Sequence, residues 1–248
     1  MKPSLPMSLP DKISRLHDYL ELGRVSNLPT VWMNTLAAAL LSGGSFSLSK
    51  TALLMAAFSM IYSGGMAMND CVDSAADAVR RPLRPIPSSR IPFAHATLAY
   101  LILFAGAMLM IHAVGGKATL EAGLILLILV TTYNLTHNHS VLAIIPMAAC
   151  RFMIYIITSL AISNSLADPL LVVAALQAGY ILLLSVVARL EKGNRIYGRF
   201  LPSVPIMLAG IPLIDGLFLA WFLQAGWLAV GIATGAATLA LQKKFRGD

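Results

Sequence analysis

The sequence predicts an all-α membrane protein, a polytopic bundle of about eight transmembrane helices, and three observations support this fold class. Of the 248 residues, 58% are hydrophobic and 12% are charged, which is about half the charged share of an average soluble domain. The apolar residues gather in long blocks, such as 98–114, 120–132 and 170–187, and repeated blocks of this kind are typical of membrane spans. They lack the apolar–polar alternation of transmembrane β-strands, so helices are favoured.

Short polar or glycine-containing turns divide the apolar part of the chain into eight expected spans, with boundaries good to about three residues. These spans are 30–47, 50–68, 93–114, 117–134, 141–162, 169–188, 201–222 and 226–242.

The N-terminal segment differs from the spans. Apolar residues such as Leu16 and Leu20 alternate there with charged residues such as Arg15, a pattern that suits a helix lying in the membrane interface. We therefore expect an amphipathic interfacial segment at 1–29 and a transmembrane domain at 30–248.

The basic residues alternate between loops, as the positive-inside rule requires. The N-terminal segment, the loops after the second and sixth spans, and the C-terminus hold most of them: Lys2, Lys12, Arg15, Arg24, Arg80, Arg81, Arg84, Arg90, Arg189, Lys192, Arg195, Arg199, Lys243, Lys244 and Arg246. The proposed outer loops hold only Lys50 and Lys117. This pattern predicts a multi-pass protein of the bacterial inner (plasma) membrane with both termini in the cytoplasm. It offers no single basic face of the kind that binds nucleic acid.

An acidic motif, N-D-C-V-D-S-A-A-D, follows the second span at residues 69–77. At about 100° per residue, Asn69, Asp70, Asp73 and Asp77 fall on one face of a helix. Charges at membrane depth are costly and usually functional, and Mg²⁺ takes oxygen ligands that substrate phosphates complete. We predict that these four residues hold Mg²⁺ and that the three aspartates are catalytic. The simpler alternative is a solvated acidic helix end.

The next segment, R-R-P-L-R-P-I-P-S-S-R at residues 80–90, adds positive charge beside the acids. Arg81 and Arg84 lie within a few residues of the last carboxylate, and guanidinium groups suit bidentate contact with phosphate oxygens. Acids and arginines together predict a site that binds Mg²⁺ and a diphosphate, with Asn69 beside both.

These motifs resemble a known family. N-D-x-x-D-x-x-x-D followed by R-P-x-R-P-I-P-S is similar to the first signature of the UbiA superfamily of membrane prenyltransferases. The segment R-V-S-N-L-P-T-V-W at 24–32, which includes Asn27, resembles that family's entry into its first helix. The resemblance implies a helical bundle around a central apolar cavity, and Mg²⁺-dependent transfer of a prenyl group from an isoprenoid diphosphate to an acceptor. It places Asn27 among the diphosphate-binding residues. Segments 133–139 and 146–151 resemble the small EboC-like branch.

The chain departs from the family pattern after the sixth span. UbiA-type enzymes carry a second aspartate motif there, whereas this chain has A-R-L-E-K-G-N-R at 188–195. The EboC-like branch has an Arg-x-Glu element that Arg189 and Glu191 match. We expect Arg189, Glu191 and Arg195 to hold the diphosphate together with one Mg²⁺. The alternative is that they only anchor the helix at the interface.

Arg151 lies nearly halfway along the fifth span, where an arginine needs an anionic partner. The expected partner is the diphosphate, and the alternative is an aspartate of the acidic motif. Asp215, in the seventh span, is interpreted as a turn or packing residue.

Two functions remain open from the sequence. The first is a membrane prenyltransferase that takes an isoprenoid diphosphate and an unidentified acceptor among membrane lipids. The alternative, which the altered second motif supports, is an isoprenoid-diphosphate binder or translocator of the same fold without transfer chemistry. A CDP-alcohol phosphotransferase is disfavoured, because its acidic motif requires D-G-x-x-A-R and here Ser74 follows Asp73.

Overall fold

The computed structural model describes residues 9–192 and 204–244, and this part of the chain is helical, without strands. The helices are α1 (Leu9–Leu22), α2 (Leu28–Leu41), α3 (Leu48–Val72), α4 (Ser74–Arg80), α5 (Phe93–Thr136), α6 (Ile144–Ser163), α7 (Asp168–Lys192), α8 (Val204–Phe222) and α9 (Gly226–Lys244), with 3-10 turns η1 (Val25–Asn27) and η2 (Val141–Ala143). The predicted all-α fold class is confirmed.

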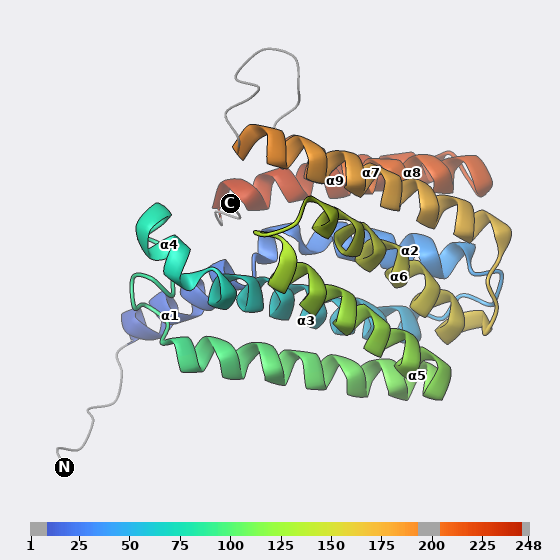
Figure 1. Cartoon of the computed structure of the whole chain (residues 1–248). Helices are drawn as coiled ribbons and strands as arrows, with labels where there is room; N and C mark the ends of the chain where they lie inside the picture. Colours follow the sequence, from blue (N-terminus) through green and yellow to red (C-terminus); the bar gives the residue numbers. More distant parts are fainter. Residues whose placement is uncertain (1–8, 193–203, 245–248) are drawn as a thin grey trace.

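The expected spans correspond to these helices, with two differences at glycines. The spans 93–114 and 117–134 are the two arms of α5, and the chain reverses between them at Gly116 (φ 73°, ψ −149°) (Figure 1). A positive φ is open to glycine because it has no Cβ. The first span is shorter than expected, since α2 ends at Leu41 and Gly43 follows with φ 75°, a common way to end a helix.

Five of the helices are long and apolar enough to cross a membrane: Leu48–Val72, Phe93–Thr136, Val141–Ser163, Asp168–Leu190 and Val204–Phe222. With α5 folded back on itself, they confirm a multi-pass membrane protein. The remaining long helices are weaker spans. The 14 residues of α2 measure about 21 Å, less than the roughly 30 Å of the hydrocarbon core.

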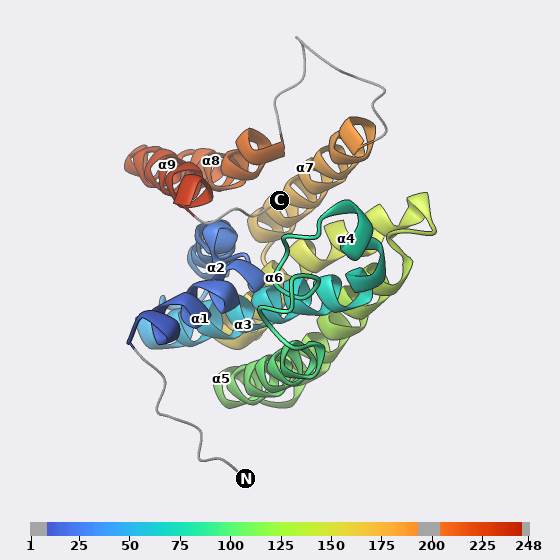
Figure 2. The ribbon, with the colours of Figure 1, turned by 90° about the vertical axis from the view of Figure 1, so that its left-hand side faces the viewer.

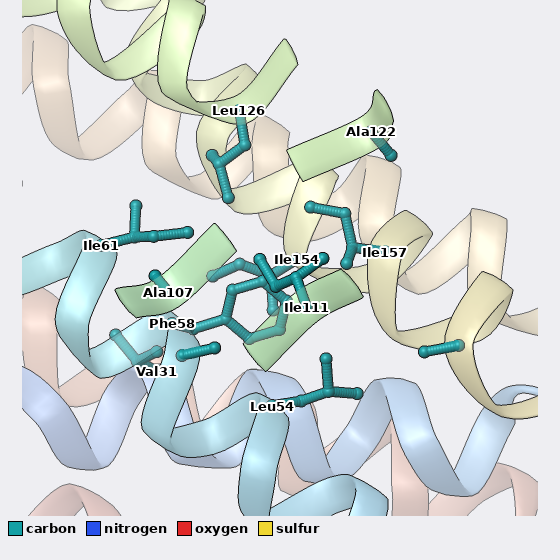
Figure 3. Packing of buried hydrophobic residues seen from close by; sticks show 12 residues of the cluster. Val31, Leu54, Phe58, Ile61, Ala107, Ile111, Ala122, Leu126, Ile154 and Ile157 are labelled. Carbon is teal, nitrogen blue, oxygen red and sulfur yellow. The ribbon is translucent and has the colours of Figure 1, made fainter. Parts of the chain in front are cut away.

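The helices lie side by side along one direction (Figure 1), and α2 is the central one. It contacts α3, α6, α7, α8 and α9, and Figure 2 shows it between α3 and the α8–α9 pair. The largest apolar cluster joins α3, α5 and α6 around Phe58, Ile61, Ile111 and Ile154, all of which are buried (Figure 3). α1, α4 and the last turn of α9 lie at the same end of the bundle, which is the end that carries the acidic motif.

Two glycines allow α8 and α9 to approach closely. A Cβ on Gly231 would lie 2.7 Å from the carbonyl oxygen of Pro212 and 2.9 Å from the Cα of Gly216, so backbone would have to move. We expect Gly231→Ala to lower the free energy of unfolding by about 1–3 kcal/mol, measured by thermal unfolding in detergent. Gly179→Ala in α7 is the matched control, because its Cβ would meet nothing within 4 Å. Equal stability of the two variants would contradict this packing.

Candidate metal and diphosphate site

The acidic motif begins in α3 and continues into α4. α3 ends at Val72, and Asp73 (φ −83°, ψ −4°) joins it to α4. The helical bonds continue through this junction, from Asp73 N–H to the Asn69 carbonyl (2.9 Å) and from Asp77 N–H to the Asp73 carbonyl (2.8 Å). The motif thus keeps helical spacing across the junction, and its side chains form two groups.

Asp70 and Asp77 form the first group, joined by Arg84. Nη1 of Arg84 lies 3.0 Å from Asp70 and 2.6 Å from Asp77, and Nη2 of Arg24 lies 3.2 Å from Asp70. The side chains of Arg84 and Asp70 are only 11% and 6% exposed, so these ion pairs are largely shielded from water. Two carboxylates and two guanidinium groups therefore balance one another at the end of the apolar bundle.

The loop before α5 and the start of η1 hold the two arginines in place. Arg84 follows Pro82 and precedes Pro85, which prevent α4 from continuing, and the loop closes through a bond from Ile91 N–H to the Pro85 carbonyl (3.0 Å). Arg24 has left-handed backbone angles (φ 46°, ψ 48°), which are uncommon for a non-glycine residue. The sequence predicted Arg84 but not Arg24.

Asp73 belongs to the second group, with residues after α5. It accepts hydrogen bonds from Asn138 Nδ2 (2.6 Å) and His137 Nε2 (3.2 Å), while Nδ1 of His137 lies 3.0 Å from the Asn134 carbonyl oxygen. The imidazole of His137 thus lies between this carboxylate and the carbonyl at the end of α5. Burial alone would raise the pKa of Asp73, but the hydrogen bonds from His137 and Asn138 hold it below its usual range.

Arg189 supports this second group from α7. Its Nη2 donates to the Ser140 carbonyl oxygen at 3.0 Å and reaches that of His137 at 3.5 Å. The loop that presents His137 and Asn138 to Asp73 is thus attached to α7. Arg189 is the member of the altered second motif that the structure brings to the acidic motif. The side chain of Glu191 and the whole of Arg195 lie outside the described residues.

The other predicted residues take different positions. Asn69 is buried, with Nδ2 at 3.5 Å from Nε2 of His137, and Arg81 is exposed. Asn27 donates to the hydroxyl of Tyr62 (3.1 Å) and accepts from Gln242 (2.8 Å), so its amide joins η1 to α3 and α9. Both polar atoms of Asn27 are therefore engaged by protein groups.

The donor chemistry of the motif fits a hard divalent cation, because it offers three carboxylates and one amide oxygen. The carboxylates do not converge on one point in this structure. The described residues contain one group of three ligand side chains within 4.8 Å of one another, His17, Asp18 and Glu21. Arg90 binds both of those acids. For Mg²⁺ to bind all three motif aspartates, their side chains would exchange protein donors for the ion.

Deeper in the bundle, Arg151 takes part in a separate polar network. Its Nη1 donates to Oδ1 of Asn34 (2.6 Å) and its Nη2 to the hydroxyl of Thr30 (3.0 Å). The Asn34 amide nitrogen then donates to Asp215 (2.5 Å). Arg151 thus reaches a carboxylate through Asn34, and that carboxylate is not in the acidic motif. Asp215 is a buried member of this network rather than a turn residue.

Comparison with known proteins finds a family match that includes the acidic motif. The UbiA prenyltransferase family matches residues 28–246. Digeranylgeranylglyceryl phosphate synthase of Methanococcus aeolicus is 35% identical over 91 residues, covering 36% of this chain and 33% of that protein. The enzyme of the same name from Methanothrix thermoacetophila is 40% identical over 86 residues, covering 34% and 32%. The similarity therefore spans about a third of the length of each curated relative.

Solved structures share the fold over most of the chain. A structure of digeranylgeranylglyceryl phosphate synthase in membranes aligns with a TM-score of 0.64 over 94% of both chains, at 15% identity. A UbiA homolog from Archaeoglobus fulgidus, bound to GPP and Mg²⁺, aligns with a TM-score of 0.60 over 92% of this chain and 87% of its own, also at 15% identity. At such identity the likeness concerns the fold of the bundle.

Proposed function

This chain belongs to the UbiA prenyltransferase family, and on that premise we propose that it transfers a prenyl group from an isoprenoid diphosphate to an acceptor in the membrane, with Mg²⁺. The observation that carries the proposal is the buried cluster of Asp70, Asp77 and Arg84, with Arg24 beside it. It puts cation ligands and phosphate-binding guanidinium groups in contact at one end of an apolar bundle. A solved relative in fold bound to GPP and Mg²⁺ supports the same ligand chemistry.

The chemistry needs a stabilised leaving group. When bound, Mg²⁺ supplies a Lewis acid that neutralises charge on the diphosphate as the bond from the prenyl carbon to oxygen breaks. Asp70, Asp73, Asp77 and Asn69 would hold the ion. Once the ion binds the carboxylates, Arg84 and Arg24 would be released from them and would donate to phosphate oxygens. Such contacts stabilise the negative charge that develops on the leaving group. Arg81, exposed at the same loop, would join them. The acceptor then forms the new bond to the prenyl carbon and loses a proton.

Within the family, we place the chain in the EboC-like branch, with a second half-site made of Arg189, Glu191 and Arg195. The sequence predicts that Asn27 and Arg151 also bind the diphosphate. Of these residues, Arg189 has the strongest support, because it anchors the loop that bears His137 and Asn138.

The absence of aspartate from residues 188–195 favours a second candidate, a diphosphate binder or translocator without transfer chemistry. Purified protein incubated with radiolabelled geranyl diphosphate, Mg²⁺ and membrane lipid extract separates the two. Labelled lipid product that disappears with EDTA supports the transferase. Binding that needs Mg²⁺ but gives no product supports the binder, and absence of Mg²⁺-dependent binding contradicts both.

Arg189→Lys tests whether the second half-site is more than an interfacial anchor. Lys keeps the positive charge and can donate to the same loop carbonyls, which both accept from the single atom Nη2 of Arg189. It has no planar guanidinium, so it cannot make a two-pronged contact with phosphate oxygens. We expect binding of geranyl diphosphate with Mg²⁺ to weaken roughly fivefold to tenfold, the size of one hydrogen bond at about 1–1.4 kcal/mol. Titration in detergent measures it, with Lys244→Arg as the control that leaves net charge unchanged. Equal affinity of Arg189→Lys and wild type would assign Arg189 to anchoring alone.

We place the acidic end of the bundle in the cytoplasm of a bacterial inner membrane, with residues 1–29 as an interfacial segment before the transmembrane domain. The alternation of basic loops supports this orientation, and the start of α1 and the end of α9 share that end. Cysteines introduced at Ser45 and Asn164 should react with an impermeant reagent from outside intact cells. Reaction only after the cells are opened would reverse the orientation.

A further inference from the structure

The polar network around Arg151 lies among apolar spans, away from the acidic motif. Arg151 is the eighth residue of α6, which starts at Ile144, so it lies about 10 Å along the helix from that start. Its partners Thr30 and Asn34 lie on α2, three and seven residues after Asn27. Thr30 and Asn34 lie about 5 and 10 Å along α2 from Asn27, so the Arg151 guanidinium, which contacts both, lies about 5–10 Å deeper than the end of the bundle that carries the diphosphate site.

The network fixes the orientation of the guanidinium. The Asn34 amide nitrogen donates to two oxygen atoms, Oδ2 of Asp215 at 2.5 Å and the hydroxyl of Tyr155 at 3.2 Å. Its carbonyl oxygen therefore faces Arg151, at 2.6 Å from Nη1. Asp215 is in turn held by the Tyr155 hydroxyl and by Gln177 at 3.0 Å. Asn34, Tyr155, Gln177 and Asp215 are all at most 1% exposed, so this side of the network is closed.

The Arg151 side chain is less enclosed than these partners. A guanidinium has five N–H donors, and within residues 9–192 and 204–244 the hydrogen-bond partners of Arg151 are two neutral oxygens, on Asn34 and Thr30. The side chain is half-buried rather than buried, and it forms no ion pair with a carboxylate of that part of the chain. Asp215 already accepts three hydrogen bonds from other groups. An oriented cation with unused donors at membrane depth fits an anionic ligand group.

We infer that Arg151, held by Thr30 and Asn34, binds an oxyanion, a carboxylate or a phosphate, on the prenyl acceptor. The identification of the ligand as the prenyl acceptor rests on the proposed function. The anion-binding site itself is inferred from the geometry alone. A position about 5–10 Å inward from the diphosphate site would let the acceptor's charged group bind Arg151 while its nucleophilic atom lies between the two sites. This assignment replaces the diphosphate as the partner of Arg151.

Binding of three matched probes tests the site without requiring turnover: octanoyl glycerol phosphate, octanoate and the uncharged octanoyl glycerol, each titrated into the full-length protein in nanodiscs. We expect wild type to bind at least one anionic probe about tenfold to a hundredfold more tightly than octanoyl glycerol, as one charge-assisted hydrogen-bonded contact provides. The tighter of the two anionic probes identifies phosphate or carboxylate as the recognised group. Arg151→Gln should remove this preference and leave the affinity for octanoyl glycerol unchanged.

Two further variants keep the test decisive. Thr30→Val removes one of the two oxygens that orient the guanidinium and keeps the side-chain shape, so it should weaken anion binding about fivefold even where Arg151→Gln does not fold. Lys117→Gln, an exposed cation on α5, controls for net charge and should behave as wild type. No anion preference in wild type, or an unchanged preference in both network variants, overturns the inference.

The same variants separate this inference from the proposed function. If Arg151→Gln loses Mg²⁺-dependent binding of geranyl diphosphate and keeps its anion preference, Arg151 belongs to the diphosphate site and the inference is wrong. If wild type prefers the anionic probes through Arg151 but forms no prenylated product, the anion site stands and the transferase proposal fails.

Discussion

Asp73→Ala is expected to weaken Mg²⁺-dependent binding of geranyl diphosphate by roughly a hundredfold or more, about 3 kcal/mol, while the protein stays folded. Asp73 is the best of the three aspartates for this test because neither of its partners is an arginine: they are the imidazole of His137 and the exposed amide of Asn138. Removing Asp70 or Asp77 would instead take away one of the two carboxylates that pair with Arg84 in a cluster largely shielded from water, and instability would then obscure the loss of binding.

Titration of geranyl diphosphate with and without Mg²⁺ measures the effect. Glu121→Gln is the matched control, because Glu121 is an exposed carboxylate that pairs with Lys117 in the second arm of α5. A thermal unfolding curve confirms that the variant is folded. Undiminished Mg²⁺-dependent affinity in Asp73→Ala would make this aspartate a structural partner of the His137 loop.

The part of the site that could be predicted from sequence is the part that is local in sequence. Helical periodicity brings Asp70 near Asp77, and a proline-rich turn returns Arg84 to both of them. Arg24 could not be predicted, because it is 46 residues from Asp70 and nothing in the sequence sets how one helix lies against another. The contact of His137 with Asp73 could not be predicted either, for the same reason, although the sequence shows both as polar residues near the ends of spans.

The fold was predictable because each apolar block must satisfy its backbone as a helix in lipid. The apolar blocks do not show which helices will pack against one another. An arginine in an apolar span needs an anionic partner, and Asp215 is an acid in another apolar span, so a link between the two was open to prediction by charge balance. In the structure Asn34 lies between them, and they form no ion pair. The choice between Asp215 and the acidic motif depends on the contacts of α2 with α6 and α8, which only the folded bundle provides.

Arg84→Gln should destabilise the protein in the absence of Mg²⁺ and make it more responsive to Mg²⁺ than wild type. Arg84 is the shared partner of Asp70 and Asp77, and all three side chains are at most 11% exposed. Removing one partner of a buried ion pair costs about 3–5 kcal/mol, since the remaining charges are left uncompensated. Mg²⁺ can neutralise the same two carboxylates, and an ion that binds only the folded state stabilises it by mass action.

The measurement is the thermal unfolding temperature of the detergent-solubilised protein over a Mg²⁺ titration. Arg81→Gln is the matched control, because Arg81 is an exposed arginine of the same loop, and exposed substitutions usually change stability by less than about 0.5 kcal/mol. If Asp70 and Asp77 are ion ligands, the rise with Mg²⁺ will be larger in Arg84→Gln than in Arg81→Gln, because in the former the ion no longer competes with the guanidinium shared by both carboxylates. Identical rises would mean that Mg²⁺ does not bind these carboxylates and that Arg84 is their permanent structural partner.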